Sequence, residues 1–278
     1  MSLLIEGVSL NGAKKDIYIE GNRIKKIADR IKEKAETVIS GKDKIAIPSF
    51  INGHTHAAMT LLRGYADDMP LQEWLLTKIW PVEAHLTEED VYWGVKLACL
   101  EMIKTGTTFF NDMYWHWRGT ARAVEEMGIR AAVSAVFIDT FNEEKMREQI
   151  ALNETLFAES AKFNPRVIFT LGPHAIYTVS EKALRWCADF AREKDILIHL
   201  HLSETREEVQ ECVKEHGARP VQYLERLGFL GPNLIACHCI WLHEEEMDLL
   251  QAYGVKVVHT PVSNMKLSVG GVFPYLQL

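Results

Sequence analysis

Two histidines separated by one residue, His54 and His56, close an apolar segment that has the character of a buried strand. Side chains alternate between the two faces of a strand, so residues i and i+2 point the same way and both imidazoles can reach one point. Neutral imidazole is the commonest protein ligand of transition metals. A second cluster, His199, His201 and Glu204, ends another apolar strand and adds a carboxylate. Together the clusters predict a metal site built from strand ends, as in a hydrolytic metalloenzyme.

Composition excludes several other classes of protein. The 278 residues, 47% hydrophobic and 25% charged, suit one large domain plus a small one. A net charge of -7 without a basic block argues against nucleic-acid binding. We expect no membrane helix, because no apolar run approaches about 18 residues, and no secretory signal. The five cysteines are scattered and odd in number, which favours free thiols and a cytoplasmic location over a disulfide framework.

The elements that must position the histidines change in character along the chain. Residues 1–47 hold short alternating stretches broken by Asn11-Gly12 and Gly21-Asn22, which are hairpin signals. We expect a small β-layer there. From residue 48 onward a strand, a loop and a helix follow one another repeatedly, and Thr87 and Ser180 are expected helix N-caps. The expected strands are residues 45–51, 107–111, 131–137, 167–171, 196–201, 234–238 and 255–259.

These strands are near-continuous apolar runs, as in a parallel sheet covered on both faces. No glycine-rich phosphate loop follows any of them, which favours a (β/α) barrel over a doubly wound sheet. The chemistry of such barrels lies at the C-terminal ends of the strands. One histidine at a strand end is usually structural, but six at the ends of five strands are hard to explain that way. These six are His54, His56, His174, His201, His238 and His259.

The segment Cys237-His238-Cys239 invites a zinc-knuckle interpretation. Strand alternation opposes it, because both thiols point away from the face that His238 uses. We therefore expect no thiolate metal site there.

Seven segments, in order along nearly the whole chain, resemble the amidohydrolase superfamily, and within it the S-adenosylhomocysteine, 5′-methylthioadenosine and related adenosine-type deaminases. They are residues 48–56 (Pro-Ser-Phe-Ile-Asn-Gly-His-Thr-His), 61–64 (Leu-Leu-Arg-Gly), 80–83 (Trp-Pro-Val-Glu), 172–174 (Gly-Pro-His), 199–204, 236–239 and 261–267 (Pro-Val-Ser-Asn-Met-Lys-Leu). The resemblance implies an α/β fold: a distorted (β/α)8 TIM-type barrel over residues 48–278. Residues 1–47 would form the N-terminal part of a small β-sandwich.

The resemblance also implies one divalent metal, zinc foremost and iron in some branches, on His54, His56 and His201. Family members add an aspartate from the eighth strand, and the sequence reaches only the seventh. We therefore expect a C-terminally truncated barrel in which the eighth strand is absent. An open sheet edge favours pairing with another chain, so a homo-oligomer is among the expected assemblies.

Roles for other residues follow from the same resemblance. Glu204 is the expected general acid and base, with a solvated start of a helix as its alternative. His238 would hydrogen-bond the attacking water. In the substrate pocket, Glu83 would accept hydrogen bonds from ribose, His174 would contact the purine, and Trp74 would line the base pocket unless it belongs to the core.

The expected reaction is metal-dependent hydrolytic deamination of a 5′-modified adenosine (S-adenosylhomocysteine, 5′-methylthioadenosine or 5′-deoxyadenosine), which releases ammonia. Relatives that prefer S-adenosylhomocysteine carry an arginine near the end of the third strand to meet the homocysteine carboxylate, whereas this chain reads Val133-Ser134-Ala135-Val136 there. Arg147 in the following segment is a candidate substitute, with a charged helix surface as its alternative. Guanine or pterin deamination and aminotriazine chlorohydrolase chemistry are alternatives, for which a ribose ligand such as Glu83 has no purpose. An inactive, truncated metal-binding scaffold is the alternative outside catalysis.

Overall fold

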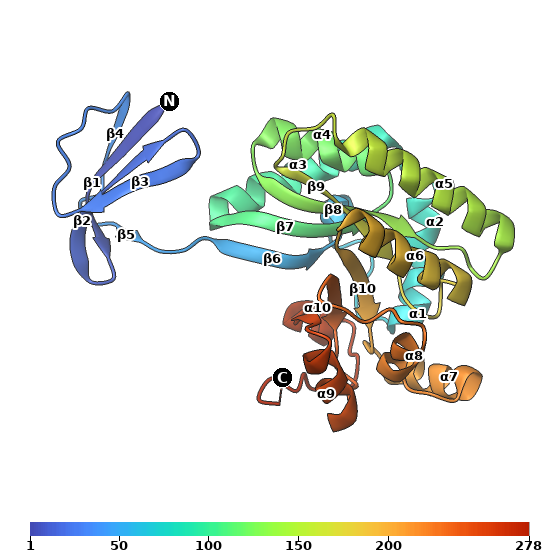
Figure 1. Cartoon of the computed structure of the whole chain (residues 1–278). Helices are drawn as coiled ribbons and strands as arrows, with labels where there is room; N and C mark the ends of the chain where they lie inside the picture. Colours follow the sequence, from blue (N-terminus) through green and yellow to red (C-terminus); the bar gives the residue numbers. More distant parts are fainter. Residues whose placement is uncertain (278) are drawn as a thin grey trace. The chain divides into compact units, whose positions relative to one another are not determined.

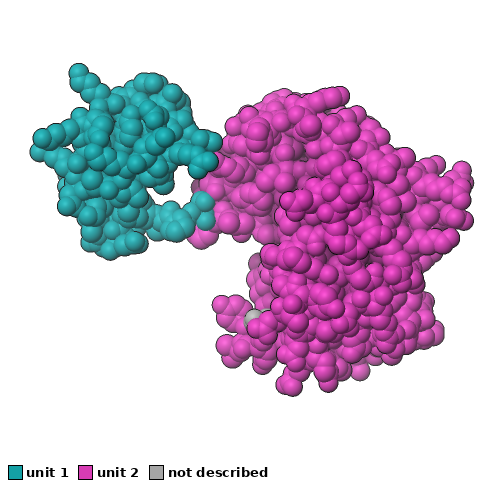
Figure 2. Space-filling view, in the orientation of Figure 1, with its two compact units in different colours: residues 1–49 teal, residues 50–278 magenta. Residues whose placement is uncertain are grey.

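The computed structural model describes residues 1–277 and divides the chain into two compact units, Met1–Ser49 and Phe50–Leu278 (Figure 2). The first unit is one mixed sheet of five strands in the order β3-β2-β1-β4, with β5 also paired to β1. Both predicted hairpins are present, and at the first of them Asn11 and Gly12 take φ of 50° and 80°, the left-handed conformation that a tight hairpin turn requires. Its strands are β1 (Ser2–Leu10), β2 (Ala13–Glu20), β3 (Arg23–Ala28), β4 (Thr37–Ser40) and β5 (Ile45–Ala46).

The prediction of one strand over residues 45–51 is wrong. Residues 45 and 46 pair with β1 in the first unit, whereas β6 begins at Phe50 and belongs to the second unit. Pro48 lies between them and has no backbone N–H to give to a ladder, which explains the break. As a consequence His54 lies within β6 and His56 directly follows that strand.

The second unit is built on seven parallel strands in the order β12-β11-β10-β9-β8-β7-β6, with helices along the outside (Figure 1). The expected barrel is thus confirmed, with seven strands in the described residues. The strands are β6 (Phe50–Thr55), β7 (Thr107–Tyr114), β8 (Arg130–Phe137), β9 (Val167–Pro173), β10 (Ile198–Leu202), β11 (Leu234–His238) and β12 (Lys256–Val258). The helices are η1 (Ala57–Leu62, 3-10), α1 (Leu71–Trp74), η2 (Leu75–Ile79, π), α2 (Trp80–Glu83), α3 (Glu88–Thr105), α4 (Trp117–Met127), α5 (Glu143–Ser160), α6 (Glu181–Lys194), α7 (Arg206–His216), α8 (Pro220–Arg226), α9 (Glu244–Ala252) and α10 (Pro261–Lys266).

Local sequence accounts for the helix boundaries that orient these strands. Thr87 forms the predicted capping box at the start of α3, and Gly106 ends that helix with φ of 87°. Ser180 caps α6 through the amide of Ala183. The side chains of β10 are buried on both faces, as the apolar runs predicted. None of the helices among residues 1–277 is long and apolar enough to cross a membrane.

The two outer strands of the seven, β6 and β12, approach each other at one point. A Cβ added to Gly53 in β6 would lie 3.0 Å from both methyl groups of Val258 in β12. Within the described residues no ladder joins the two strands. The glycine therefore permits a close contact there, which brings His54 toward the histidines of β10 and β11.

Candidate metal and catalytic site

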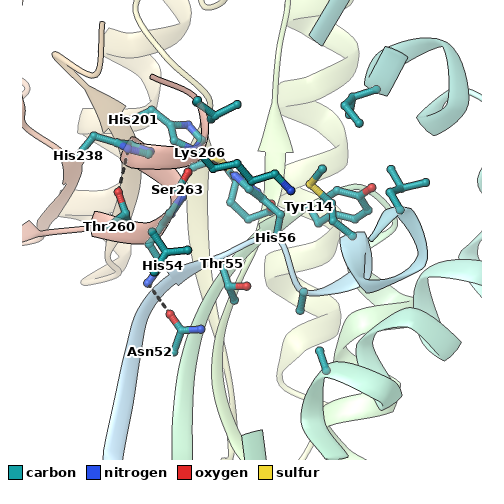
Figure 3. A pocket seen from close by; sticks show the side chains of 18 of the residues that line it. Asn52, His54, Thr55, His56, Tyr114, His201, His238, Thr260, Ser263 and Lys266 are labelled. Atoms are coloured by element: carbon teal, nitrogen blue, oxygen red, sulfur yellow. Dashed lines mark hydrogen bonds between the residues drawn. The ribbon is translucent and has the colours of Figure 1, made fainter. Parts of the chain in front are cut away.

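A cavity of about 940 Å³ opens where these strands end in the second unit (Figure 3). The structure places all eight residues predicted from sequence on its wall. They are His54, His56, Trp74, Glu83, His174, His201, Glu204 and His238. The cavity is therefore the place to ask what these side chains can do together.

Backbone carbonyl groups fix the orientation of two of the histidine rings. His56 donates from Nδ1 to the carbonyl of Met113 at 2.6 Å, and His201 donates from Nδ1 to the carbonyl of His174 at 2.8 Å. A carbonyl can only accept, so in each neutral ring the proton lies on Nδ1 and Nε2 keeps a bare lone pair.

The two Nε2 atoms of His56 and His201 face each other at 3.3 Å. Two lone pairs at that separation repel unless a cation lies between them. Two nitrogens bound tetrahedrally to one zinc ion, with bonds of about 2.0–2.1 Å, would also be separated by about 3.3 Å. The spacing and the tautomers of these rings thus fit a divalent metal.

Two further histidines complete the cluster. The ligand atoms of His54, His201 and His238 lie within 4.8 Å of one another, and the ring of His54 lies 4.9 Å from that of His56, centroid to centroid. His238 shares its Nδ1 with the Asn264 side chain at 2.8 Å, which leaves Nε2 as its second ring nitrogen. Burial lowers the pKa of each of these four rings, that of His238 to about 4, so the cluster is neutral and able to donate lone pairs at neutral pH.

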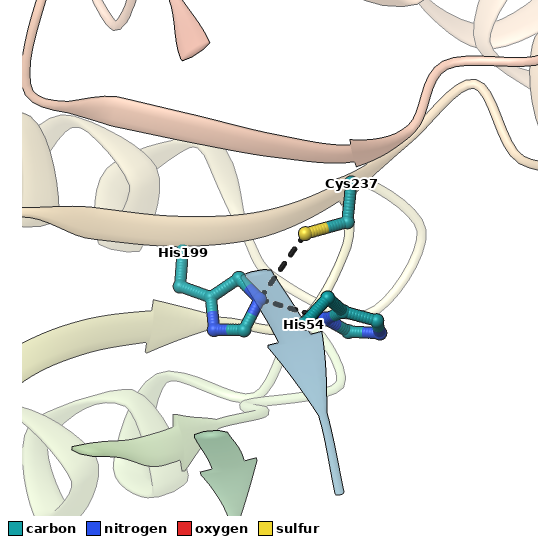
Figure 4. Close-up of side chains that lie close together, drawn as sticks. All are labelled: His54, His199 and Cys237. Atoms are coloured by element: carbon teal, nitrogen blue, oxygen red, sulfur yellow. Dashed lines mark hydrogen bonds between the residues drawn. The ribbon is translucent and has the colours of Figure 1, made fainter. Parts of the chain in front are cut away.

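His199, which belongs to the second cluster predicted from sequence, lies beside His54 together with Cys237, for which no metal site was expected (Figure 4). His199 Nε2 is 2.7 Å from His54 Nδ1 and 3.1 Å from Cys237 Sγ, and the His199 and Cys237 side chains are fully buried. Ligands of one zinc ion stand roughly 3.3–3.6 Å apart. These shorter separations suit hydrogen bonds, so we interpret the group as a support for the His54 ring.

Glu204 lies at the turn after β10, and only 4% of it is exposed. The alternative expectation, a solvated residue at the start of a helix, is therefore wrong. Its Oε1 is 3.4 Å from His238 Nδ1. Burial raises the pKa of Glu204 to about 8, and the neighbouring charge of Glu208 adds to the shift. The carboxyl group is therefore able to hold a proton at neutral pH and present it to the cavity.

Glu83 lies on α2 with 9% of it exposed, and its Oε2 accepts a hydrogen bond from Trp115 Nε1 at 3.0 Å. Trp74 donates through its indole N–H to the carbonyl of Ala66 at 3.1 Å and lines the same cavity. The π-helix η2 joins these two residues, a form often found at functional sites. Tyr114 was missed from sequence, because β7 runs past the predicted end at residue 111. Burial and the nearby charge of Glu83 raise the pKa of the Tyr114 hydroxyl, which lines the same cavity.

His174 lies directly after β9 and its Nδ1 is 2.9 Å from the Thr178 hydroxyl. Burial lowers its pKa to about 3, so the ring is neutral. Arg147 lies elsewhere: it pairs with Glu143 on the surface of α5, and its side chain is 71% exposed. It does not line the cavity, so the structure does not bring it to the site.

Residues 45–271 match the sequence profile of the amidohydrolase family. The chain belongs to this family. A 5′-deoxyadenosine deaminase from Methanoregula boonei is 48% identical over 100% of this chain, and a 5-methylthioadenosine/S-adenosylhomocysteine deaminase 1 from Archaeoglobus fulgidus is 49% identical over 94% of it. The chain spans 64% and 61% of the lengths of these two relatives.

Solved amidohydrolase structures share the fold. An adenosine deaminase from Xanthomonas campestris with bound zinc has a TM-score of 0.92 and 34% identity, with 99% of this chain and 66% of that chain covered. A guanine deaminase from C. acetobutylicum has a TM-score of 0.89 at 20% identity, over 99% of this chain and 71% of that one. The second likeness shows the fold alone. The family and the barrel expected from the sequence motifs are thus confirmed.

Proposed function

We propose that this chain forms the metal and substrate site of a hydrolytic deaminase that acts on a 5′-modified adenosine. The observation that carries the proposal is the pair of bare Nε2 atoms of His56 and His201, 3.3 Å apart in a cavity that also holds buried Glu204. The similarity to named 5′-deoxyadenosine and 5-methylthioadenosine/S-adenosylhomocysteine deaminases supports the substrate class.

One divalent ion would be held by His54, His56 and His201, with His238 adjacent. We favour zinc over iron as this ion. The zinc-bound adenosine deaminase of similar structure supports this choice of metal. When bound, such an ion supplies a Lewis acid that lowers the pKa of water toward about 7. The hydrogen bonds from the Nδ1 atoms of His56 and His201 to backbone carbonyls would keep both rings oriented for it.

The reaction adds water to the purine carbon that bears the amine and expels ammonia. Protonation of the adjacent ring nitrogen makes that carbon more electrophilic, and Glu204 is the group able to deliver this proton. His238, held at Nδ1 by Asn264, would present its other nitrogen to the hydroxyl that adds. The closeness of Glu204 Oε1 to the His238 ring, 3.4 Å, keeps the two groups on one side of the cavity.

A nucleoside fits the wall around Glu83. Trp115 occupies Oε2, which leaves Oε1 for the hydroxyls of a ribose. The apolar rings of Trp74 and Trp115, both on the cavity wall, would flank the nucleoside. A free base, a pterin or a triazine has no group that needs a buried carboxylate there, so Glu83 favours a nucleoside over these alternatives.

The charges on the wall favour a neutral 5′-substituent. Among the described residues, the lysine and arginine side chains that line the cavity are Arg63 and Lys266. Each already has a carboxylate partner: Glu101 binds Arg63 at 2.7 Å and Asp67 binds Lys266 at 2.5 Å. We therefore expect 5′-deoxyadenosine and 5′-methylthioadenosine to be better substrates than S-adenosylhomocysteine, whose amino-acid carboxylate would need a cation.

The test is ammonia release by the purified, zinc-loaded chain. The panel holds 5′-deoxyadenosine, 5′-methylthioadenosine, S-adenosylhomocysteine, guanine, a pterin and an aminotriazine, with zinc content measured in parallel. We expect the two neutral nucleosides to lead. Ammonia from guanine or the triazine but not from nucleosides would overturn the proposal, and one zinc per chain without any turnover would support the inactive scaffold.

The cellular location is a separate proposal. All five cysteines are free and buried. Thiols in that state suit a reducing compartment, and we propose the cytoplasm. Localisation of a tagged chain in cells, with thiol titration of the isolated protein, tests this, and an extracellular, disulfide-bonded chain would overturn it.

A further inference from the structure

The turn that carries Glu204 is held by a second buried carboxylate, Glu208. Its Oε1 accepts from the amide of Ser203 at 2.8 Å, and its Oε2 accepts from the amide of Glu204 at 2.8 Å. Ser203 takes φ of 50°, a left-handed conformation that is unfavourable for serine. Only 3% of Glu208 is exposed. Each oxygen of one carboxylate thus holds one amide of a strained turn.

The same turn is bonded to the segment that follows His238. The Ser203 carbonyl accepts from the amides of Ile240 at 3.0 Å and Trp241 at 2.9 Å. Its neighbour, the carbonyl of Leu202, accepts from the amide of Cys239 at 2.9 Å. His238 itself has φ of 73°. The turn after β10 and the turn after β11 are therefore one hydrogen-bonded unit, with the carboxylate of Glu208 at its base.

Glu208 lacks the partner that usually explains a buried carboxylate. Within the described residues, no lysine or arginine forms an ion pair with it, and its hydrogen bonds go to backbone amides. Thr205 fixes the start of its helix, because the threonine hydroxyl accepts from the Glu208 amide at 3.2 Å. Thr205 already caps this helix, so the side chain of Glu208 is not needed for that purpose. The two acceptor oxygens of Glu208 must then serve the turn.

We propose that Glu208 is a positioning residue that sets the Glu204 carboxyl group and the His238 ring in register across the cavity. The expected effect on catalysis rests on the proposed function. The expected effect on the turn rests on the hydrogen bonds alone. Glutamine has nearly the same shape, but its amide offers one acceptor oxygen and places an NH₂ group against the second backbone N–H. The variant E208Q therefore removes one of the two bonds with little change in volume.

The first experiment compares E208Q with E207Q, an exposed neighbour in the same helical turn. We expect E208Q to lower kcat by about 100-fold, the cost of a misplacement of about 1 Å. KM and zinc content should stay near the wild-type values. E207Q should match the wild type in all three. A purely structural role predicts a lower Tm with an unchanged kcat, and that result would overturn the inference.

The second experiment uses no turnover and separates this inference from the proposed function. In the unaltered protein, the Ser203 and Glu204 amides should exchange slowly with solvent and resonate downfield in NMR spectra, as amides bound to a carboxylate do. E208Q should lose the slow exchange and the downfield shift at one amide or both, and E207Q should keep them. Rapid exchange at both amides in the wild type would overturn the inference even if the protein deaminates nucleosides. Intact amide signals with no ammonia release would instead refute the proposed function alone.

Discussion

Replacing Glu204 with glutamine is the sharpest test of the proposed acid–base chemistry. The side chain is 4% exposed and faces the cavity beside His238, so an isosteric amide should occupy the same space. Glutamine cannot release the proton that the ring nitrogen of the substrate needs. The loss should therefore fall on the chemical step.

The structure bounds the magnitude of this loss. General acid–base catalysis by a positioned side chain contributes about 10²- to 10⁴-fold, or about 3–5 kcal/mol of the barrier. We expect E204Q to lose about 10³-fold in kcat and to keep a KM near the wild-type value.

The pH profile gives a second readout with a definite sign. Burial raises the pKa of Glu204 to about 8, so the acid form dominates at neutral pH and ionises as the pH rises. A bound cation would pull this pKa downward. The wild-type rate should therefore fall on the alkaline side, at or below pH 8, and the residual rate of E204Q should lack that limb.

The assay is steady-state ammonia release from 5′-deoxyadenosine at pH 5.5 to 9.5, with zinc content measured for each sample. E207Q is the matched control, because Glu207 is exposed on the first turn of α7. A kcat for E204Q within tenfold of the wild type, with the alkaline limb unchanged, would refute the role assigned to Glu204. Loss of zinc from E204Q would show instead that this residue supports the metal.

Three further outcomes follow from other contacts. H56N should weaken zinc binding by more than the ~10–100-fold typical of an outer-shell change, measured by competition with a fluorescent chelator; unchanged affinity would remove His56 from the ligand set. E246Q should lower the free energy of unfolding in urea by about 3 kcal/mol or more, because Glu246 is fully buried and 2.7 Å from Arg219; a loss below 1 kcal/mol would contradict this. Without metal, stability should peak near pH 6.5. Six histidines with lowered pKa reduce the stability below that pH, whereas three buried acids with raised pKa reduce it as the pH rises toward 7–8. A Tm that rises steadily to pH 9 in EDTA would refute this. The groups are His54, His56, His174, His199, His201 and His238, against Asp112, Glu204 and Glu208.

The features predicted best from the sequence are helix caps and turns, which depend on local chemistry. The cap at Thr87 and the turn at Asn11 depend on groups a few residues away, and both are present as predicted. The strand ends that carry His201 and His238 followed from long apolar runs. The error at residues 45–51 came from reading one apolar run as one strand, although Pro48 marked the break.

Contacts between strands were beyond such reasoning. His199 and Cys237 meet across the β10–β11 ladder, and only the register of that ladder shows that they support His54. Glu208 has the sequence signature of an ordinary first-turn acid, which the helix dipole favours. Its two bonds to the Ser203 and Glu204 amides depend on a left-handed backbone angle at Ser203 that no residue type announces.

Backbone groups, which do not depend on the residue type, decide the tautomers of the histidines at the metal site. The proton of His56 is held by the Met113 carbonyl and that of His201 by the His174 carbonyl. A carbonyl is the same whatever its side chain, so these two positions can vary without disturbing the rings, provided that the ends of β7 and β9 stay in place. The apolar packing that fixes strand register therefore also decides which imidazole nitrogen is bare. In this barrel, the core and the chemistry of the site are set by the same hydrogen-bonded strands.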